Sequence, residues 1–165
     1  MGKTKRPIVE LHTDGSFKGN PKCGGYSGVM VSGQHVMAFV GRDEHAKDND
    51  HMELQALVTG LREINTEAKV HVSSDSQYVV NGVNSWINNW KRNGWKTQKG
   101  KDIANKELWQ EIAELKKKHT IKATWVKGHL DNPTSTEEIA NHVCDELAQR
   151  AADGNIYFND TGRQP

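Results

Sequence analysis

The sequence predicts an α/β fold, in which helices pack against a mixed sheet of five strands. Three strand-like runs come first and are joined by short turns, which predicts an antiparallel meander. Two more strand-like runs follow, and helical patterns separate them from the meander and from each other. The 165 residues are 35% hydrophobic and 26% charged, a composition typical of a globular chain with a real core.

One domain accounts for a chain of this length, and its core needs neither disulfides nor a structural metal. We expect a single domain over residues 1–165, with its core at about 8–152 and a polar tail at 153–165. No run of about 18 apolar residues is present, so no membrane-spanning helix is expected. The N-terminus has no apolar signal region, and Cys23 and Cys144 are too few for a disulfide framework. These features predict a cytoplasmic protein.

The first three strands are expected near the N-terminus. Residues 7–13 alternate loosely between apolar and polar and predict a strand that ends at Asp14. Asp14 is followed by glycine, a common hairpin corner, so a role in a turn is one interpretation of this acid. The segments 25–32 and 35–41 are rich in strand-forming residues, and a short turn with one glycine separates them.

A helix and a fourth strand are expected next. The helix begins near Asn49 or Asp50, either of which can serve as its N-cap. Residues 69–75 predict a strand that ends in an acid, Asp75, and the residues after it are typical of a helix. The apolar positions of the first helix are Leu54, Leu57, Val58, Leu61 and Ile64.

The last three elements are a helix over 103–118, a strand over 121–129 and a helix over 136–152. Both helices carry apolar residues three or four positions apart, a spacing that gathers them on one helix face. The residues expected to face the core are Leu108, Ile112 and Leu115 in the first of these helices, and Ile139, Val143, Leu147 and Ala151 in the second.

Four acids stand at positions suited to a common site. Asp14 and Asp75 end predicted strands, where ligands bind in open α/β sheets. Glu53 lies in the first turn of a helix, and Asp145 lies on the same face of the last helix as Asn141. Taken singly, each acid can be a turn, cap or surface residue. Together they would repel unless cations neutralised them, and an all-oxygen site suits Mg²⁺ or Mn²⁺.

Residues 86–101, WINNWKRNGWKTQKGK, form a basic and aromatic stretch without an acid, although the whole chain has a net charge of only +1. Such a patch fits a nucleic-acid groove, where cations meet phosphates and rings meet sugars or bases. The alternative is an amphipathic helix that buries its tryptophans and exposes its lysines. The residues concerned are Trp86, Trp90, Trp95, Lys91, Arg92, Lys96, Lys99 and Lys101.

Six segments resemble type 1 ribonuclease H in order and approximate spacing. They are DGSFKGNPKCGGYSG, HMELQALVTGL, SSDSQYVVNGV, WINNWKRNGWKT, WVKGH and NHVCDELA, and they extend from Ile8 to Ala151. The resemblance is closest to the compact bacterial form with a basic protrusion. It implies the ribonuclease H-like fold, with strands 1-2-3 antiparallel, strands 1-4-5 parallel and helices on both faces. It also implies hydrolysis of the RNA strand of RNA–DNA hybrids, leaving 3′-hydroxyl and 5′-phosphate ends.

The resemblance assigns roles to the acids. Asp14, Glu53, Asp75 and Asp145 match the family's ligands for two Mg²⁺ ions, with Mn²⁺ as a possible substitute. In that mechanism one ion activates the attacking water and the other stabilises the departing 3′-oxyanion. His129, in WVKGH, matches a loop histidine that assists proton transfer or product departure. The resemblance therefore implies a metal-dependent endoribonuclease.

The resemblance also implies that the chain is a monomer, that its partner is the hybrid, and that it needs no obligate protein partner. It further implies which residues contact the hybrid. The first hairpin reads the 2′-hydroxyl through its backbone, and two polar side chains read the minor groove. The protrusion holds the DNA strand. The implied contacts are Gly15, Ser16 and Asn20 in the hairpin, Asn49 and Gln77 in the minor groove, and Trp86, Trp90, Lys91, Arg92, Trp95, Lys96, Thr97 and Asn105 on the DNA strand.

The chain departs from the family pattern in three places. His142 replaces a supporting glutamate, and Glu137 or Glu138 is a candidate to compensate. The segment 130–140 is longer than expected, and Asp48 stands where a threonine often helps to hold a DNA phosphate. Two alternatives stay open: a hybrid-binding module without strong catalysis, and another nuclease of the same broad fold, such as a resolvase or integrase.

Overall fold

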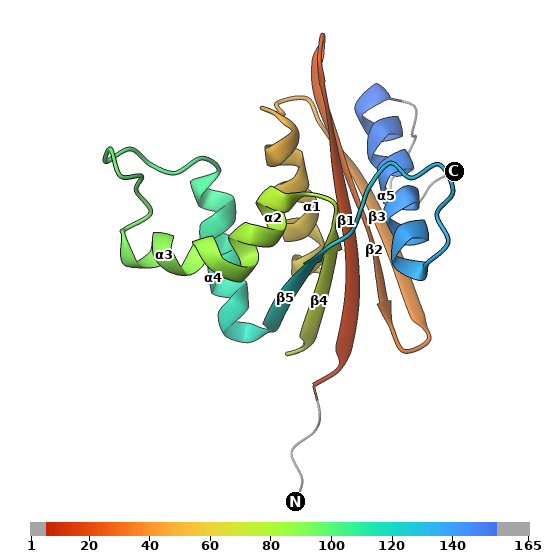
Figure 1. Cartoon of the computed structure of the whole chain (residues 1–165), viewed down its shortest axis with the longest axis horizontal. Helices are drawn as coiled ribbons and strands as arrows, with labels where there is room; N and C mark the ends of the chain where they lie inside the picture. The colour runs from red at the N-terminus through yellow and green to blue at the C-terminus, as the bar shows by residue number, and fades with distance from the viewer. Residues whose placement is uncertain (1–5, 155–165) are drawn as a thin grey trace, which may run out of the picture.

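The five strands form one mixed sheet in the order β3-β2-β1-β4-β5 (Figure 1). β1 is antiparallel to β2, and β2 to β3, whereas β1, β4 and β5 run parallel. The predicted fold class is therefore confirmed. In the computed structural model, which describes residues 6–154, the strands are β1 (Ile8–Gly19), β2 (Lys22–Ser32), β3 (His35–Asp43), β4 (Lys69–Ser74) and β5 (Thr120–Trp125).

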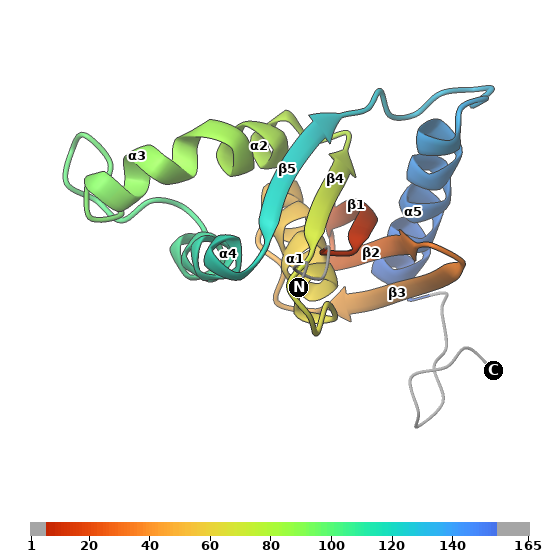
Figure 2. The same ribbon diagram turned by 90° about the horizontal axis from the view of Figure 1, so that it is seen from below.

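Helices cover both faces of the sheet (Figure 2). Neighbouring residues of β2 show the two sides, because Gly24 faces Met52 of α1 and Gly25 faces Ala148 of α5. The helices are α1 (Asn49–Arg62), α2 (Gln77–Asn81), α3 (Ile87–Arg92), α4 (Lys106–Lys118) and α5 (Thr136–Asp153), and a π-helical turn, η1 (Gly82–Trp86), joins α2 to α3.

β1 is longer than the sequence predicts. It continues past Asp14, which pairs with Ser27 of β2, and the hairpin turn lies at residues 20–21. The prediction that Asp14 ends a strand at an Asp-Gly corner is therefore wrong. Glycine at Gly15 serves packing instead, since a Cβ there would overlap the backbone of Met52 and Glu53 in α1.

α1 packs its apolar face on β1 and β2. Leu54, Leu57 and Leu61 are fully buried, as the spacing predicts. The N-cap is Asp48, whose Oδ1 accepts a hydrogen bond from the backbone N–H of His51 at 2.8 Å. The expected caps, one or two residues later, are thus inside the helix.

α5 buries a different face from the predicted one. Ile139 and Val143 are 48% and 42% exposed, and Leu147 is half-buried. Of the predicted core positions only Ala151 is buried. The helix lies so close to β2 that a Cβ on Gly25 would overlap the backbone of Ala148, so only small side chains fit between them. The buried residues of α5 are Asn141, Cys144, Ala148, Ala151 and Ala152.

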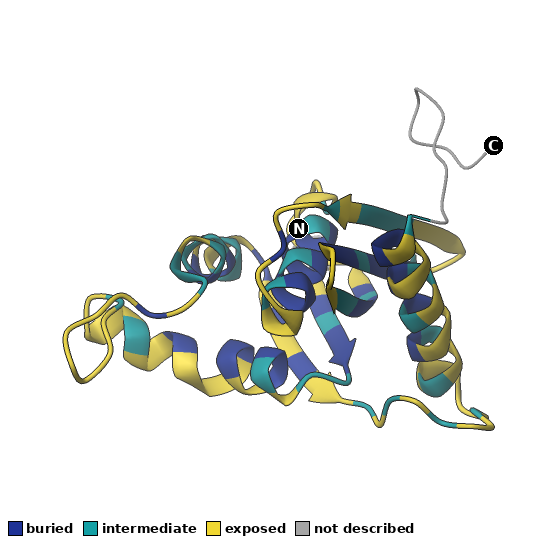
Figure 3. Ribbon diagram, turned by 90° about the horizontal axis from the view of Figure 1, so that it is seen from above, coloured by how far each residue is buried: buried dark blue, intermediate teal, exposed yellow. Residues whose placement is uncertain are grey.

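The segment from α2 to α4 projects from the body of the molecule, and most residues of α3 are exposed (Figure 3). Its base is anchored by Trp109, which is fully buried in α4 and lies against Gly82. Lys116 donates a hydrogen bond to the carbonyl oxygen of Val83 at 2.7 Å, which satisfies a backbone group of the π-helical turn. α4 begins at Lys106, three residues later than predicted, and Leu108 and Leu115 are only partly buried.

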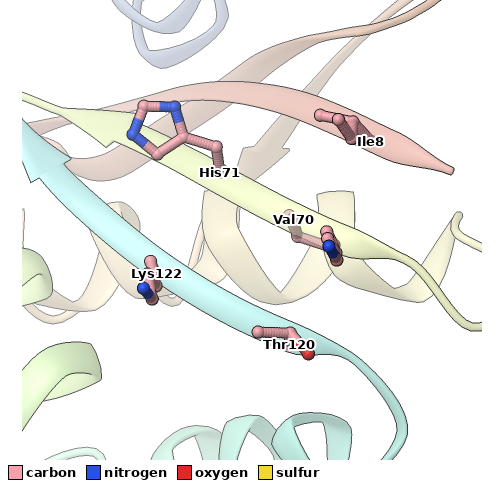
Figure 4. A pocket seen from close by; sticks show the side chains of 6 residues that line it. Ile8, Val70, His71, Thr120 and Lys122 are labelled. Atoms are coloured by element: carbon pink, nitrogen blue, oxygen red, sulfur yellow. The ribbon is translucent and has the colours of Figure 1, made fainter. Parts of the chain in front are cut away.

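The outward face of β4 and β5 carries no covering helix among residues 6–154. A shallow pocket of about 370 Å³ lies there and exposes mostly apolar atoms (Figure 4). At the outer edge of β5, the side chain of Asn84 accepts from the N–H of Ala123 and donates to its carbonyl oxygen. No helix among the described residues is long and apolar enough to cross a membrane.

Candidate active site

Three acids converge where β1 and β4 separate. Asp14, Glu53 and Asp75 offer carboxylate oxygens that all lie within 4.8 Å of one another. Asp14 is 2% exposed and Glu53 is 6% exposed. Three carboxylates this close and this buried are costly unless protons or cations neutralise them.

The sheet register explains why two strands deliver acids to one place. The parallel pairing of β1 with β4 ends at His12 and Ser73. An aspartate stands two residues after each, Asp14 within β1 and Asp75 directly after β4. Asp14 is therefore beyond the carboxyl end of the parallel pairing even though β1 itself continues. The sequence argument about strand ends holds for the parallel part of the sheet.

Glu53 reaches the two aspartates from α1. Its Oε1 accepts the backbone N–H of Gly15 at 2.6 Å, and its Oε2 lies 3.5 Å from Ser74 Oγ, which donates to it. Ser74 Oγ also accepts the N–H of Ser76 at 3.1 Å. These contacts hold the Glu53 carboxylate in place. The sequence argument did not select Ser74 as a supporting residue, although its position next to Asp75 is a signal that could have indicated it.

The electrostatics of the cluster favour protonated acids when no cation is bound. Burial raises the pKa of Asp14 far above its usual range, and the negative charges of Glu53 and Asp75 raise it further. Burial likewise raises the pKa of Glu53 to about 7, although the neighbouring Asp14 carboxyl and the hydrogen bond from the N–H of Gly15 oppose the shift. The pKa of Asp75 is raised by burial too, while the neighbouring Asp14 carboxyl and the nearby His129 lower it.

A divalent cation fits this donor set. The ligand atoms are all carboxylate oxygens, which Mg²⁺ and Mn²⁺ prefer. Asp14 Oδ2 is buried and has no hydrogen-bond partner, so a bound cation would supply the interaction that this oxygen lacks. The arrangement can hold a cation at the carboxyl end of the parallel strands.

Asp145 and His129 lie at the rim of the same cleft. The cleft has a volume of about 380 Å³ and is lined by all four acids and by His129. Asp145 is outside the group of three mutually close acids. His129 Nδ1 lies 3.5 Å from Asp145 Oδ2, with the histidine side chain 74% exposed and the aspartate 14%. His129 also has a positive φ of 56°, which is uncommon for a residue other than glycine.

Some of the expected hybrid contacts line this cleft. Gly15, Ser16 and Asn49 do so, whereas Asn20 lies at the tip of the first hairpin and Gln77 is exposed at the start of α2, both outside the cleft lining. Phe17 and Lys18 also line it and belong to the hairpin segment 15–20, whose backbone is expected to contact the RNA. Residues of the lining that the sequence argument did not select are Asp50, Ser76 and Gln149.

The basic and aromatic stretch is neither wholly core nor wholly solvated. Trp86 and Trp90 lie with their ring centroids 5.9 Å apart, and Trp90 lies 5.1 Å from the buried Trp109. Trp86 is exposed, whereas Trp90 and Trp95 are partly buried. The tryptophans thus form an aromatic surface attached to the core.

Some polar side chains of the stretch are exposed, whereas others form hydrogen bonds or ion pairs within the protein. Lys91, Lys99 and Lys101 are exposed, and Arg92 donates to Asn89. Lys96 forms an ion pair with Asp102 at 2.5 Å. The expected phosphate contacts Thr97 and Asn105 both make internal hydrogen bonds, since Thr97 Oγ1 accepts from Lys101 N and Asn105 Nδ2 donates to Tyr78 Oη.

The departures from the family pattern have structural counterparts. His142 lies 3.5 Å from Glu146 and does not line the cleft. Glu138 forms a capping box with Ser135 at the start of α5, so its carboxylate is used there. Glu137 is exposed and does not line the cleft either. Neither glutamate therefore reaches the cleft to compensate for His142.

Replacement of Gly15 by alanine should destabilise the junction of β1 and α1. The added methyl group would overlap the backbone of Met52 and Glu53, and overpacking typically costs about 1–3 kcal/mol. Urea unfolding should show a lower midpoint for Gly15→Ala. Gly19→Ala is the matched control, because a Cβ there meets nothing within 4 Å. Equal midpoints for the two variants would contradict this packing argument.

Comparison with known proteins agrees with the geometry. The RNase H family matches residues 6–153 of the chain. The chain belongs to the type 1 ribonuclease H family. It is 42% identical to ribonuclease H of Aeromonas hydrophila over 157 residues, which are 95% of this chain and 97% of that one.

Two further ribonucleases H support the assignment. The protein of Pectobacterium carotovorum is 42% identical over 159 residues, 96% of this chain and 98% of its own. A crystal structure of a type 1 ribonuclease H with the type 2 active-site motif superposes with a TM-score of 0.76 and is 26% identical. That match covers 93% of this chain and 76% of the other. Membership places the chain among hydrolytic nucleases.

Proposed function

We propose that this ribonuclease H is an endoribonuclease that hydrolyses the RNA strand of RNA–DNA hybrids. The products are 3′-hydroxyl and 5′-phosphate ends. The observation that carries the proposal is the convergence of Asp14, Glu53 and Asp75 on one point, within 4.8 Å, in a chain of this family. Asp145 and His129 border the same cleft.

The four acids are the proposed ligands of two Mg²⁺ ions, for which Mn²⁺ can substitute. Bound there, the ions would supply an activated water and neutralise the leaving oxygen. Asp14 contributes its unpartnered Oδ2, and Glu53 is held in place by the N–H of Gly15. Asp75 follows β4 directly, so the sheet fixes its backbone.

His129 is proposed to move a proton at its imidazole or to speed product departure. Its exposed side chain at the rim can reach a bound substrate, while its contact with Asp145 keeps it at the site. The positive φ of His129 holds the residue in a conformation that the surrounding loop must maintain. Glycine at Gly128 lets the loop pass close to Asp75, because a Cβ there would overlap the Asp75 carboxylate.

The hybrid is proposed to lie across the cleft and the protrusion. The backbone of the first hairpin, with Gly15, Ser16 and Asn20, would contact the RNA 2′-hydroxyl groups, and Asn49 and Gln77 the minor groove. The DNA strand would contact Trp86, Trp90, Lys91, Arg92, Trp95, Lys96, Thr97 and Asn105. Because Asp48 caps α1 and adds a negative charge beside this path, we infer a weaker phosphate contact there.

We further propose that the chain acts as one catalytic domain and as a cytoplasmic monomer, with the hybrid as its partner. A pure hybrid-binding module is disfavoured by the buried acids. Three close carboxylates would repel a polyanion and destabilise the fold unless protons or cations neutralised them, and a module that only binds the hybrid gains nothing from such a cluster.

A cleavage assay tests the proposal. The purified chain is incubated with an RNA–DNA hybrid, duplex RNA and duplex DNA of one sequence, each with Mg²⁺ or with EDTA. Cleavage of the RNA strand of the hybrid alone, and only with Mg²⁺, supports the proposal. Hybrid binding without cleavage would favour the binding module, and cleavage of duplex DNA would favour another nuclease of the fold.

Replacement of His129 by alanine should slow hybrid cleavage by roughly one to two orders of magnitude without abolishing it. Proton-transfer assistance contributes about 10²–10⁴-fold, and an exposed histidine at the rim should lie at the low end. Single-turnover cleavage, with the enzyme in saturating excess over the hybrid, measures the change. His142→Ala is the matched control, because His142 lies outside the cleft lining. A folded His129→Ala variant with no activity would mean that the histidine is essential, contrary to the role proposed here.

A further inference from the structure

Gln149 lies one helical turn beyond Asp145 on α5 and lines the same cleft. Its Nε2 donates a hydrogen bond to Asp145 Oδ2 at 3.0 Å. His129 Nδ1 lies 3.5 Å from that same oxygen. One oxygen of Asp145 is therefore held from two sides, by its own helix and by the loop that follows β5.

Asp145 needs such support more than the other three acids. Asp14 and Asp75 are placed by the sheet, and Glu53 is fixed by the N–H of Gly15. Asp145 comes from α5 and is not part of the mutually close group. An aspartate at the edge of a group of like charges favours side-chain orientations that point away from them. A donor on one of its oxygens restricts these orientations before any cation arrives.

The helix that carries Gln149 is itself anchored on this side. Asp153, four residues further along α5, forms an ion pair with Lys18 of β1, and Lys18 also lines the cleft. Asp145, Gln149 and Asp153 are spaced four residues apart and so lie on one helix face. The part of α5 that carries Gln149 is therefore connected by an ion pair to β1, the strand that carries Asp14.

We propose that Gln149 is a positioning residue that holds Asp145 by Oδ2 in the orientation required for binding a divalent cation. The inference rests on the proposed function, in which Asp145 is a cation ligand. Gln149 acts through Asp145, so its loss weakens cation binding and lowers turnover. The affinity for the hybrid does not depend on it.

The test measures Mn²⁺ binding to the hybrid-free protein by calorimetry, together with kcat and KM for the hybrid at a fixed, subsaturating Mg²⁺ concentration. Gln149→Leu keeps the size and removes the donor. We expect roughly 10-fold weaker Mn²⁺ binding, the low end for the loss of a partner of a metal ligand, a lower kcat and an unchanged KM. Glu146→Gln is the control, because Glu146 is on the same helix but outside the cleft lining.

A double-mutant cycle with Asp145→Asn separates the possible outcomes. In the Asp145→Asn background, Gln149→Leu should cause no further loss of Mn²⁺ affinity. Wild-type Mn²⁺ binding by Gln149→Leu, an equal loss in both backgrounds, or a change in KM alone would overturn the role of Gln149 and leave the proposed function standing. Wild-type Mn²⁺ binding and cleavage by Asp145→Asn would instead overturn the ligand assignment on which the proposed function depends.

Discussion

Replacement of Asp14 by asparagine should abolish hybrid cleavage while the fold stays intact. Asp14 is the most central of the close acids, since its pKa responds to Glu53, Asp75 and Asp145 together. An amide in its place removes one anionic ligand from the point where the proposed cations bind. Asp75→Asn should have the same effect. The measurement is single-turnover cleavage at saturating Mg²⁺, with circular dichroism to verify the fold.

Glu114→Gln is the control for the loss of one negative charge, because Glu114 is exposed on α4 and outside the cleft lining. It should cleave at the wild-type rate. Near-wild-type turnover by Asp14→Asn or Asp75→Asn would refute the two-metal assignment.

The same Asp14→Asn variant should be more heat-stable than the wild type in EDTA, and the gain should depend on pH. Folded Asp14 binds its proton more tightly than unfolded Asp14, whose pKa is about 3.9. Proton binding by Asp14 therefore stabilises the folded state at low pH, and this stabilisation is lost as the pH rises above about 4. Asparagine does not titrate, so its advantage should be small at pH 4 and larger at pH 8. Thermal unfolding at both pH values measures the difference.

Neutralisation of three lysines in the protrusion should weaken hybrid binding and flatten its dependence on salt. Lys91, Lys99 and Lys101 are the suitable set, because they are exposed, whereas Lys96 is paired with Asp102. Each lost phosphate contact should reduce the slope of log affinity against log salt by up to roughly 0.9. The change should appear mainly in KM, because these contacts are the same in the ground and transition states.

The control for this triple Lys→Gln variant removes the same charge elsewhere. Lys69 and Lys122 belong to the shallow pocket on the outward face of β4 and β5, and Lys117 is exposed on α4. The triple Lys→Gln variant at these positions should keep the wild-type salt slope. If the protrusion variant also keeps it, the basic stretch is a solvated helix and not a phosphate-binding surface.

The sequence predicts the order and type of the elements well, because turns and apolar periodicity are local properties. Its errors arise where packing between segments distant in the sequence determines which residues are buried. Ile139 and Val143 fit a buried helix face by hydropathy, yet the close approach of α5 to Gly25 admits only small residues such as Ala148. A pattern within one helix cannot report how near the facing strand comes.

The acids of the candidate site could be selected from the sequence, but their unequal placement could not. Strand ends indicate Asp14 and Asp75, and a helix start indicates Glu53. That Asp145 stands apart from the other three depends on the position of α5 over the sheet. The supporting donors, Gly15 N–H and Gln149 Nε2, become visible only once the elements are assembled.

The contact between Asn84 and Ala123 makes the two edges of the sheet unequal. An open edge strand presents free N–H and C=O groups to which a strand of another molecule can add. On β5 the amide of Asn84 occupies both groups of Ala123, and so acts as a side-chain substitute for a sixth strand. β3, which is the opposite edge, exposes Val36 and Met37 along its length. Strand addition at Ala123 is thus obstructed on the edge beside β4, whereas the edge formed by β3 belongs to the half of the sheet that carries none of the four acids.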